Sequence, residues 1–138
     1  MEDKWQFALY DLDWAWYFRD GFYGLLAPDK VAQHATLGLA AFQNKEFRAK
    51  FLTRMAQLKN GVLSNEHVLQ RIDHYVQLLS PEVEREKARW GGNYAQWEKN
   101  VEKMRSYITE NDHWARLERQ LTAYVGLTDT EKSTYLGG

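Results

Sequence analysis

The sequence predicts a mainly α-helical fold with a short β-strand or hairpin at its N-terminus. From Pro28 onward, apolar residues recur three and four positions apart between capping residues and glycines, which is the spacing of amphipathic helices. Before that point, residues 4–10 alternate in the manner of a strand. No repeat, linker or low-complexity segment divides the 138 residues, so we expect a single domain over residues 1–138.

The predicted strand covers Lys4–Tyr10, and Trp5, Phe7 and Leu9 fall on one face of it. A lone strand is not stable, so it must pair with another segment. Residues 11–28 are rich in aromatic side chains and are interrupted by two glycines and a proline. We expect them to form an irregular loop with one short helical turn.

Six helices are predicted from their caps and stops. Asn44, Ser64 and Asn93 are residue types that accept hydrogen bonds from first-turn amides, and Gln96 follows Asn93 at the spacing of a capping box. Pro81 is expected to begin a new helix, because proline is favoured at the first helical position. The expected helices cover residues 29–42, 44–61, 64–80, 81–90, 93–111 and the stretch from a break near residue 111 to residue 126.

Most of these helices carry an apolar stripe that we expect to face a core. The stripes are Phe47, Phe51, Met55 and Leu58; Val68, Ile72, Tyr75 and Leu79; Tyr94, Trp97, Val101, Met104 and Ile108; and Trp114, Leu117, Leu121 and Tyr124. The tail from Thr128 to Gly138 shows no strong pattern.

Composition limits the classes of function. The net charge is -1 with both signs interspersed, which argues against nucleic-acid binding and against a polybasic membrane surface. No apolar run is long enough for a transmembrane helix. Because cysteine is absent, disulfides, thiolate catalysis and cysteine-ligated zinc are excluded. The 6 Trp, 8 Tyr and 6 Phe indicate a core heavy in aromatic side chains.

Two acids follow the predicted strand directly. If the backbone stays extended, Asp11 and Asp13 point to the same side, because residues two apart share a face. Paired carboxylates form a hard-oxygen site suited to Mg²⁺ or Mn²⁺, ions that also bind substrate phosphates. The sequence therefore predicts a metal site at Asp11 and Asp13, and a solvated turn is the alternative.

Other polar residues are weaker candidates. Asp20 could support the metal site from behind, whereas the acids at 82, 84 and 86 suit a solvated helix start. The histidines at 34, 67, 74 and 113 lack the spacing of a metal site. Neither a nucleophile motif nor a glycine-rich phosphate loop is present, so catalytic residues remain unassigned.

Several stretches in this order resemble the CotH kinase family, named for spore coat protein H of spore-forming bacteria. The stretches are residues 4–14 (KWQFALYDLDW), 44–54 (NKEFRAKFLTR), 68–73 (VLQRID), Trp90 with 97–101 (WEKNV), and 124–127 (YVGL). The resemblance implies the helical C-lobe of an atypical protein kinase, which transfers the γ-phosphate of ATP to Ser/Thr of coat proteins with a divalent metal. It implies that Asp11 is the metal-binding acid that meets ATP and that Asp13 is the second acidic position.

The resemblance also has gaps. The family's ATP-contacting Lys, its partner acid and its catalytic-loop Asp precede the strand, and none is matched here. Together with the abrupt start at Met1, which is no signal peptide, this predicts an excised piece or truncated reading frame, inactive by itself. The compartment is not fixed by the sequence, and the resemblance implies a spore coat or another extracytoplasmic location in a bacterium for the parent protein.

Two other functions stay open. The first is a non-catalytic helical module that binds proteins or associates with itself through an apolar stripe such as Tyr94 to Ile108. The second is a piece of a metal-dependent glycosyltransferase, a class that also uses Asp-x-Asp. The long helical region and the lack of βαβ units fit that class poorly.

Overall fold

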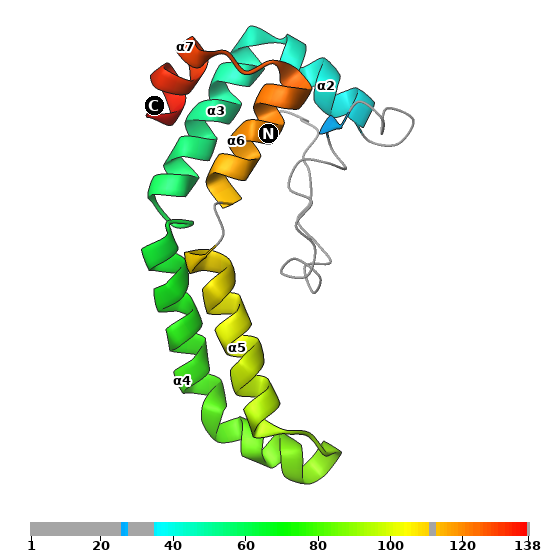
Figure 1. The fold of residues 1–138 in the computed structure, drawn as a ribbon, viewed down its shortest axis with the longest axis vertical. Coiled ribbons are helices and arrows are strands. Elements are labelled where there is room, and N and C mark those ends of the chain that lie inside the picture. The colour runs from blue at the N-terminus through cyan, green and yellow to red at the C-terminus, as the bar shows by residue number, and fades with distance from the viewer. Residues whose placement is uncertain (1–25, 28–34, 111–112, 138) are drawn as a thin grey trace, which may run out of the picture.

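The computed structural model describes residues 26–27, 35–110 and 113–137. Within these ranges the chain forms helices and no strand, which confirms the prediction of a mainly helical fold. The predicted strand Lys4–Tyr10, the loop after it and the predicted helix start at Asp29 lie outside the described residues. Figure 1 shows two regions, a helical bundle and a long two-helix arm that extends from it.

The bundle consists of α2 (Thr36–Gln43), α3 (Lys45–Asn60), α6 (His113–Val125), α7 (Asp129–Glu131) and the π-helix η3 (Lys132–Leu136). α3 packs against α2 on one side and against η3 on another, so the end of the chain closes the bundle. The apolar core joins all of these elements except α7. Its buried members are Leu26, Phe42, Leu52, Met55, Leu121, Leu127 and Leu136.

The arm is an antiparallel pair, α4 (Asn65–Trp90) and α5 (Tyr94–Thr109), that turns at two glycines (Figure 1). Gly91 has φ 74°, a left-handed conformation that side-chain-bearing residues rarely adopt. The most buried residues of the arm are Ile72 and Ile108, and neither belongs to the bundle core. The arm therefore has a thin apolar seam of its own.

Polar contacts join the two helices of the arm at three levels. Near the bundle, the Asn65 amide donates a hydrogen bond to the carbonyl of Ile108 (3.2 Å). In the middle, the Arg105 guanidinium pairs with the Asp73 carboxylate. Near the tip, the hydroxyls of Ser80 and Tyr94 lie 2.9 Å apart.

The predicted N-caps are confirmed. The Asn44 side chain accepts a hydrogen bond from the Phe47 amide (3.0 Å), and Ser64 accepts one in the same way from the third residue of α4 (3.3 Å). Asn93 also caps its helix, but the predicted capping box with Gln96 does not form. The Gln96 side chain donates to Asn100 instead.

The predicted break at Ser80-Pro81 is wrong, because α4 is one continuous helix with Pro81 inside it. Proline removes one helical amide and crowds the preceding turn, which bends a helix without always ending it. Figure 1 shows α4 changing direction toward its C-terminal end. The acids at 82, 84 and 86 are exposed or nearly so, as expected, but they lie in mid-helix rather than at a helix start.

The predicted stripe on α4 is partly wrong. Ile72 is buried, but Tyr75 and Leu79 are 48% and 49% exposed. Val76 and Val83 are half-buried in their place, because α5 covers the adjacent side of the helix. The α5 stripe is confirmed, since all five of its members are half-buried or buried, as are the four on α6.

Most of the α3 stripe is confirmed, because Met55 is buried and Phe51 and Leu58 are half-buried. Leu52 and Met55 are the buried residues of α3, while Phe47 is 41% exposed. Among the described residues, no helix combines the length and apolarity needed to cross a membrane.

Candidate functional site

The predicted metal ligands cannot be placed. Asp11 and Asp13 lie outside the described residues, as do Asp20 and His34. Within residues 26–27, 35–110 and 113–137, no three acidic or histidine side chains gather in a way that could hold a metal ion. Residues 44–54, one of the family-like stretches, lie wholly within the described residues.

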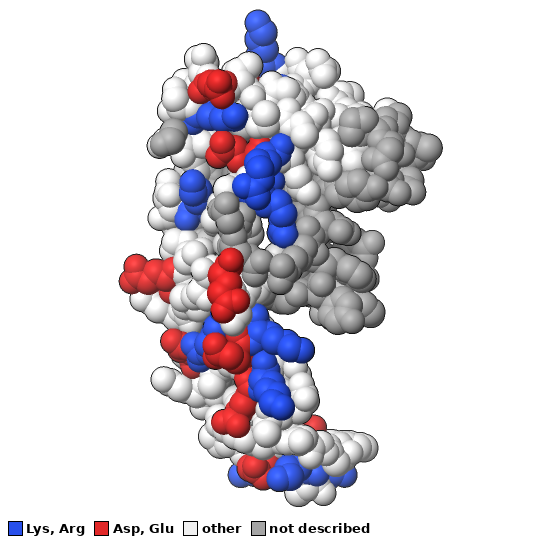
Figure 2. Space-filling model, in the orientation of Figure 1, with Lys and Arg blue, Asp and Glu red and all other residues white. Residues whose placement is uncertain are grey.

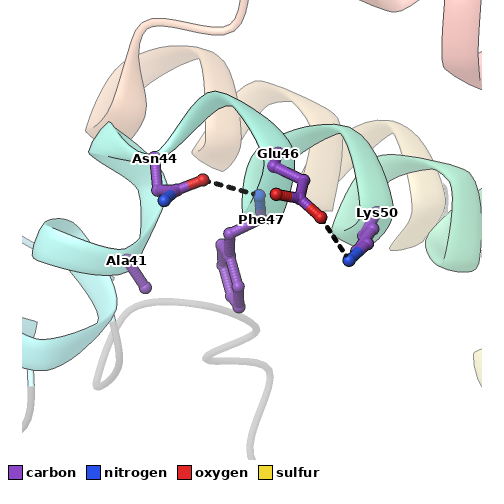
Figure 3. A pocket seen from close by; sticks show the side chains of 5 residues that line it. All are labelled: Ala41, Asn44, Glu46, Phe47 and Lys50. Carbon is purple, nitrogen blue, oxygen red and sulfur yellow. Dashed lines mark hydrogen bonds and ion pairs between the residues drawn. The ribbon is translucent and has the colours of Figure 1, made fainter.

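A hollow of about 410 Å³ lies where α2 ends and α3 begins (Figure 3). It is lined by Ala41, Asn44, Glu46, Phe47 and Lys50. Asn44 is extended (φ -80°, ψ 116°), so the chain turns sharply between the two helices. The turn leaves the Phe47 ring at the surface beside the hollow.

Charge in the hollow is balanced. The Lys50 ammonium lies 2.6 Å from the Glu46 carboxylate, one turn away on α3. The hydrogen bond and the positive charge of Lys50 lower the pKa of Glu46, although burial opposes them. Both groups are well exposed, so the pair adds little stability. The hollow offers one aromatic face and a paired charge.

Phe47, which lines the hollow, also forms an aromatic cluster with Phe42 and Phe51. Phe42 meets Phe51 edge-on at 4.9 Å and Phe47 at 5.5 Å between ring centroids. These are favourable ring arrangements, and Phe42 is buried. The cluster joins α2 to α3 beside the hollow.

On another side of α3, the Arg48 side chain contacts residues between 125 and 131, near the C-terminus. We call this set of contacts the Arg48 network: the guanidinium forms a two-pronged pair with the Glu131 carboxylate and also donates to the carbonyls of Val125 (2.7 Å) and Gly126 (2.8 Å). These carbonyls lie at the C-terminal end of α6, where helical partners run out. One side chain thus caps α6 and holds α7 on α3.

Glu131 is itself oriented by Thr128. The Thr128 hydroxyl and amide both donate to Glu131 Oε2, at 2.8 and 2.9 Å, and the Glu131 amide donates to the Thr128 hydroxyl. This reciprocal arrangement is a capping box. Its Thr-x-x-Glu spacing is visible in the sequence and could have revealed α7, but the pairing with Arg48 is non-local.

The hydrogen bond from Arg48 lowers the pKa of Glu131 from its usual 4.5 to about 2, against the effect of burial. A lowered pKa means that the carboxylate stabilises the fold fully above pH 4.5. That stabilisation is lost as pH falls toward 2, because the folded state must then take up a proton at a cost.

We therefore expect Glu131→Gln to be less stable than the parent at neutral pH and to lose less stability in acid. The urea midpoints of both proteins, measured from about pH 6 to about pH 3, should converge as pH falls. If the difference between the two urea midpoints stays constant over this range, the charge of the Glu131 carboxylate does not contribute to stability.

Most of the chain is similar to a known protein family. A family model described as CotH kinase protein matches residues 1–115. The matched range holds Asp11, Asp13 and the whole of the stretch 44–54. The chain therefore belongs to the CotH kinase family. No curated protein and no solved structure matches it.

The matched range and the folded unit do not coincide. The family match covers the first three residues of α6, whereas Leu121, Leu127 and Leu136 of the bundle core lie beyond it. Arg48 lies inside the matched range and its partners lie outside. The stretch 44–54 therefore owes part of its packing to residues that the family model does not describe.

Proposed function

We propose that this chain is the helical C-terminal part of a CotH-type protein kinase and supplies its metal-binding acids. In this proposal the carboxylates of Asp11 and Asp13 hold Mg²⁺ or Mn²⁺ at the phosphates of ATP. The phosphate is transferred to Ser/Thr of a coat-type protein. The observation that carries the proposal is the family match, which spans both acids and most of the helices.

The donor set suits this role. Two carboxylates separated by one residue provide the hard oxygen ligands that Mg²⁺ and Mn²⁺ prefer. When bound, such an ion offsets the negative charge of the phosphates. Phosphoryl transfer depends mainly on positioning, so the helices would contribute by holding the segment that carries both acids.

Metal binding tests the proposal directly. We expect Mn²⁺, followed by electron paramagnetic resonance of the free ion, to bind the intact chain and to bind Asp11→Asn about tenfold more weakly or worse, because one of two ligands is lost. Asp129→Asn is the matched control, since that side chain is 99% exposed and far along the sequence. Equal Mn²⁺ binding by the parent and Asp11→Asn would refute the metal role.

The same samples serve for an assay with radiolabelled ATP. No residue of this chain is matched to the family's ATP-contacting Lys or catalytic-loop Asp. We therefore expect this chain alone to transfer no measurable radiolabelled phosphate to protein. Incorporation that Asp11→Asn abolishes would support the kinase assignment and contradict the expected inactivity.

A second function is favoured by a specific observation. Tyr75, Leu78 and Leu79 expose about half or more of their surface on the arm, away from the bundle core. Apolar side chains grouped in this way are typical of sites that bind proteins. A helical interaction module is therefore the alternative, but its surface lies on α4 and not on the α5 stripe, which the arm itself covers.

A further inference from the structure

One side of α4 is exposed along about four turns. We call it the Leu78 face, and it consists of Arg71, Tyr75, Leu78, Leu79, Glu82 and Glu86. Their spacing places Arg71, Tyr75, Leu78 and Leu79 on one side of the helix before Pro81, and Glu82 and Glu86 continue that side beyond the bend. α5 covers a different side, where Ile72, Val76 and Val83 are buried or half-buried.

The centre of the Leu78 face is apolar. Tyr75 is 48% exposed, Leu78 60% and Leu79 49%. Nothing within the described residues covers these side chains. Their grouping on one helix side, rather than scattering over the surface, is what makes the face unusual for a free surface.

The two ends of the Leu78 face carry opposite charges. Arg71 lies at the N-terminal end, where its guanidinium sits 5.1 Å from the centre of the Tyr75 ring and donates to the Tyr75 hydroxyl (3.1 Å). Glu82 and Glu86 lie at the C-terminal end. Positions 71 and 86 are equally far from the midpoint between Leu78 and Leu79.

We propose that a second copy of this chain packs on the Leu78 face, with the two α4 helices antiparallel and crossing at Leu78 and Leu79. A two-fold axis then sets Leu78 of each copy against Leu79 of the other and Arg71 against Glu86. A parallel pair would set Arg71 on Arg71 and Glu86 on Glu86, so charge favours the antiparallel arrangement.

The same register explains Tyr75, which it sets opposite Glu82 of the other copy. The Tyr75 hydroxyl already accepts from Arg71, so its own hydrogen is available to a carboxylate. Glu82 keeps its local pair with Arg85 at 3.0 Å and retains acceptor capacity for that hydrogen. Each polar group of the face thus has a partner when two copies meet.

Figure 2 shows acidic and basic side chains interleaved on one side of the arm, whose place is seen in Figure 1. This pairing uses no residue of the proposed metal site, so it stands or fails independently of the kinase proposal.

Charge exchange tests the arrangement. Sedimentation of the full chain at about 5 to 200 μM should show a monomer–dimer equilibrium in the micromolar range, because the face is small. Arg71→Glu and Glu86→Arg should each weaken association about tenfold or more, since each brings like charges together twice. The double variant should regain the parent's association. A mixture of the two single variants should regain it too, because both contacts between positions 71 and 86 in the mixed dimer then pair opposite charges.

Controls separate folding from association. Lys99→Glu changes an exposed charge on α5, outside the Leu78 face, and should leave the equilibrium unchanged. Circular dichroism should show the same helix content in every variant. A parent chain that stays monomeric at the highest concentration, or an association that the single charge changes do not weaken, would overturn the proposal. Association weakened by either single variant and not recovered by the mixture would overturn the antiparallel register.

Discussion

Replacing Arg48 by alanine is expected to lower the free energy of unfolding by about 2–4 kcal/mol, because several polar groups lose their partner at once. The Arg48 and Glu131 side chains are only 14% and 23% exposed, so neither is fully resolvated when the other is removed. The carbonyls of Val125 and Gly126 also lose a donor. The change therefore loosens both the end of α6 and the attachment of α7 to α3.

Urea unfolding followed by circular dichroism measures this effect. Arg54→Ala is the matched control, because Arg54 lies on the same helix, is exposed and has only a long bond (3.3 Å) to Gln57; it should cost no more than about 0.5 kcal/mol. Arg48→Lys should fall between the two, since lysine keeps the charge but cannot make the two-pronged pair. If Arg48→Ala is as stable as Arg54→Ala, the Arg48 network does not hold the bundle together.

Leu52→Ala is expected to cost about 3–4 kcal/mol, because Leu52 is fully buried and its removal leaves a cavity in the bundle core. Leu52 lies on α3, the helix that contacts both α2 and η3, so neighbours on two sides would have to move to fill the space. The Arg48 network and the phenylalanine cluster hold those neighbours in place, so they cannot move far enough to fill the cavity.

Thermal or urea unfolding tests this prediction too. Leu37→Ala removes the same atoms from α2, where the side chain is 64% exposed, and should cost less than about 1 kcal/mol. Similar costs for the two variants would mean that the core is not centred on α3. Amide hydrogen exchange in the Leu52 variant should quicken in α3 and α6 more than in the arm, whose seam around Ile72 and Ile108 is separate.

Local signals predicted much of the fold. Asn44, Ser64 and Asn93 cap helices as expected, because a cap depends only on a side chain and the amides two or three residues ahead. The helix ends at Gly61 and Gly91 follow from local backbone geometry in the same way. The α5 and α6 stripes were also predicted, since each helix has a single apolar side.

Features set by distant partners could not be predicted. On α4 the apolar residues span more than one side, and periodicity alone does not say which side a single neighbouring helix will cover. Tyr75 and Leu79 were therefore expected inside and lie outside. Pro81 is predicted to separate two helices, but α4 is continuous through it.

The candidate site shows the same difference between local sequence signals and contacts with distant residues. The sequence predicts Asp11 and Asp13 as metal ligands, and that remains a prediction, because both lie outside the described residues. The sequence singles out Arg48 only as part of the stretch 44–54. Its partners lie 77 to 83 residues further on, so no local pattern could identify them.

The ring of Pro81 also determines where the tip of the arm points. With no amide hydrogen at position 81, the carbonyl of Gln77 lacks its helical donor. The segment beyond Pro81 runs in a different direction from the first four turns of α4 (Figure 1). Trp90, which is 70% exposed, ends this segment about a dozen ångströms beyond Pro81 along the helix, so the bend decides the direction in which its side chain is presented.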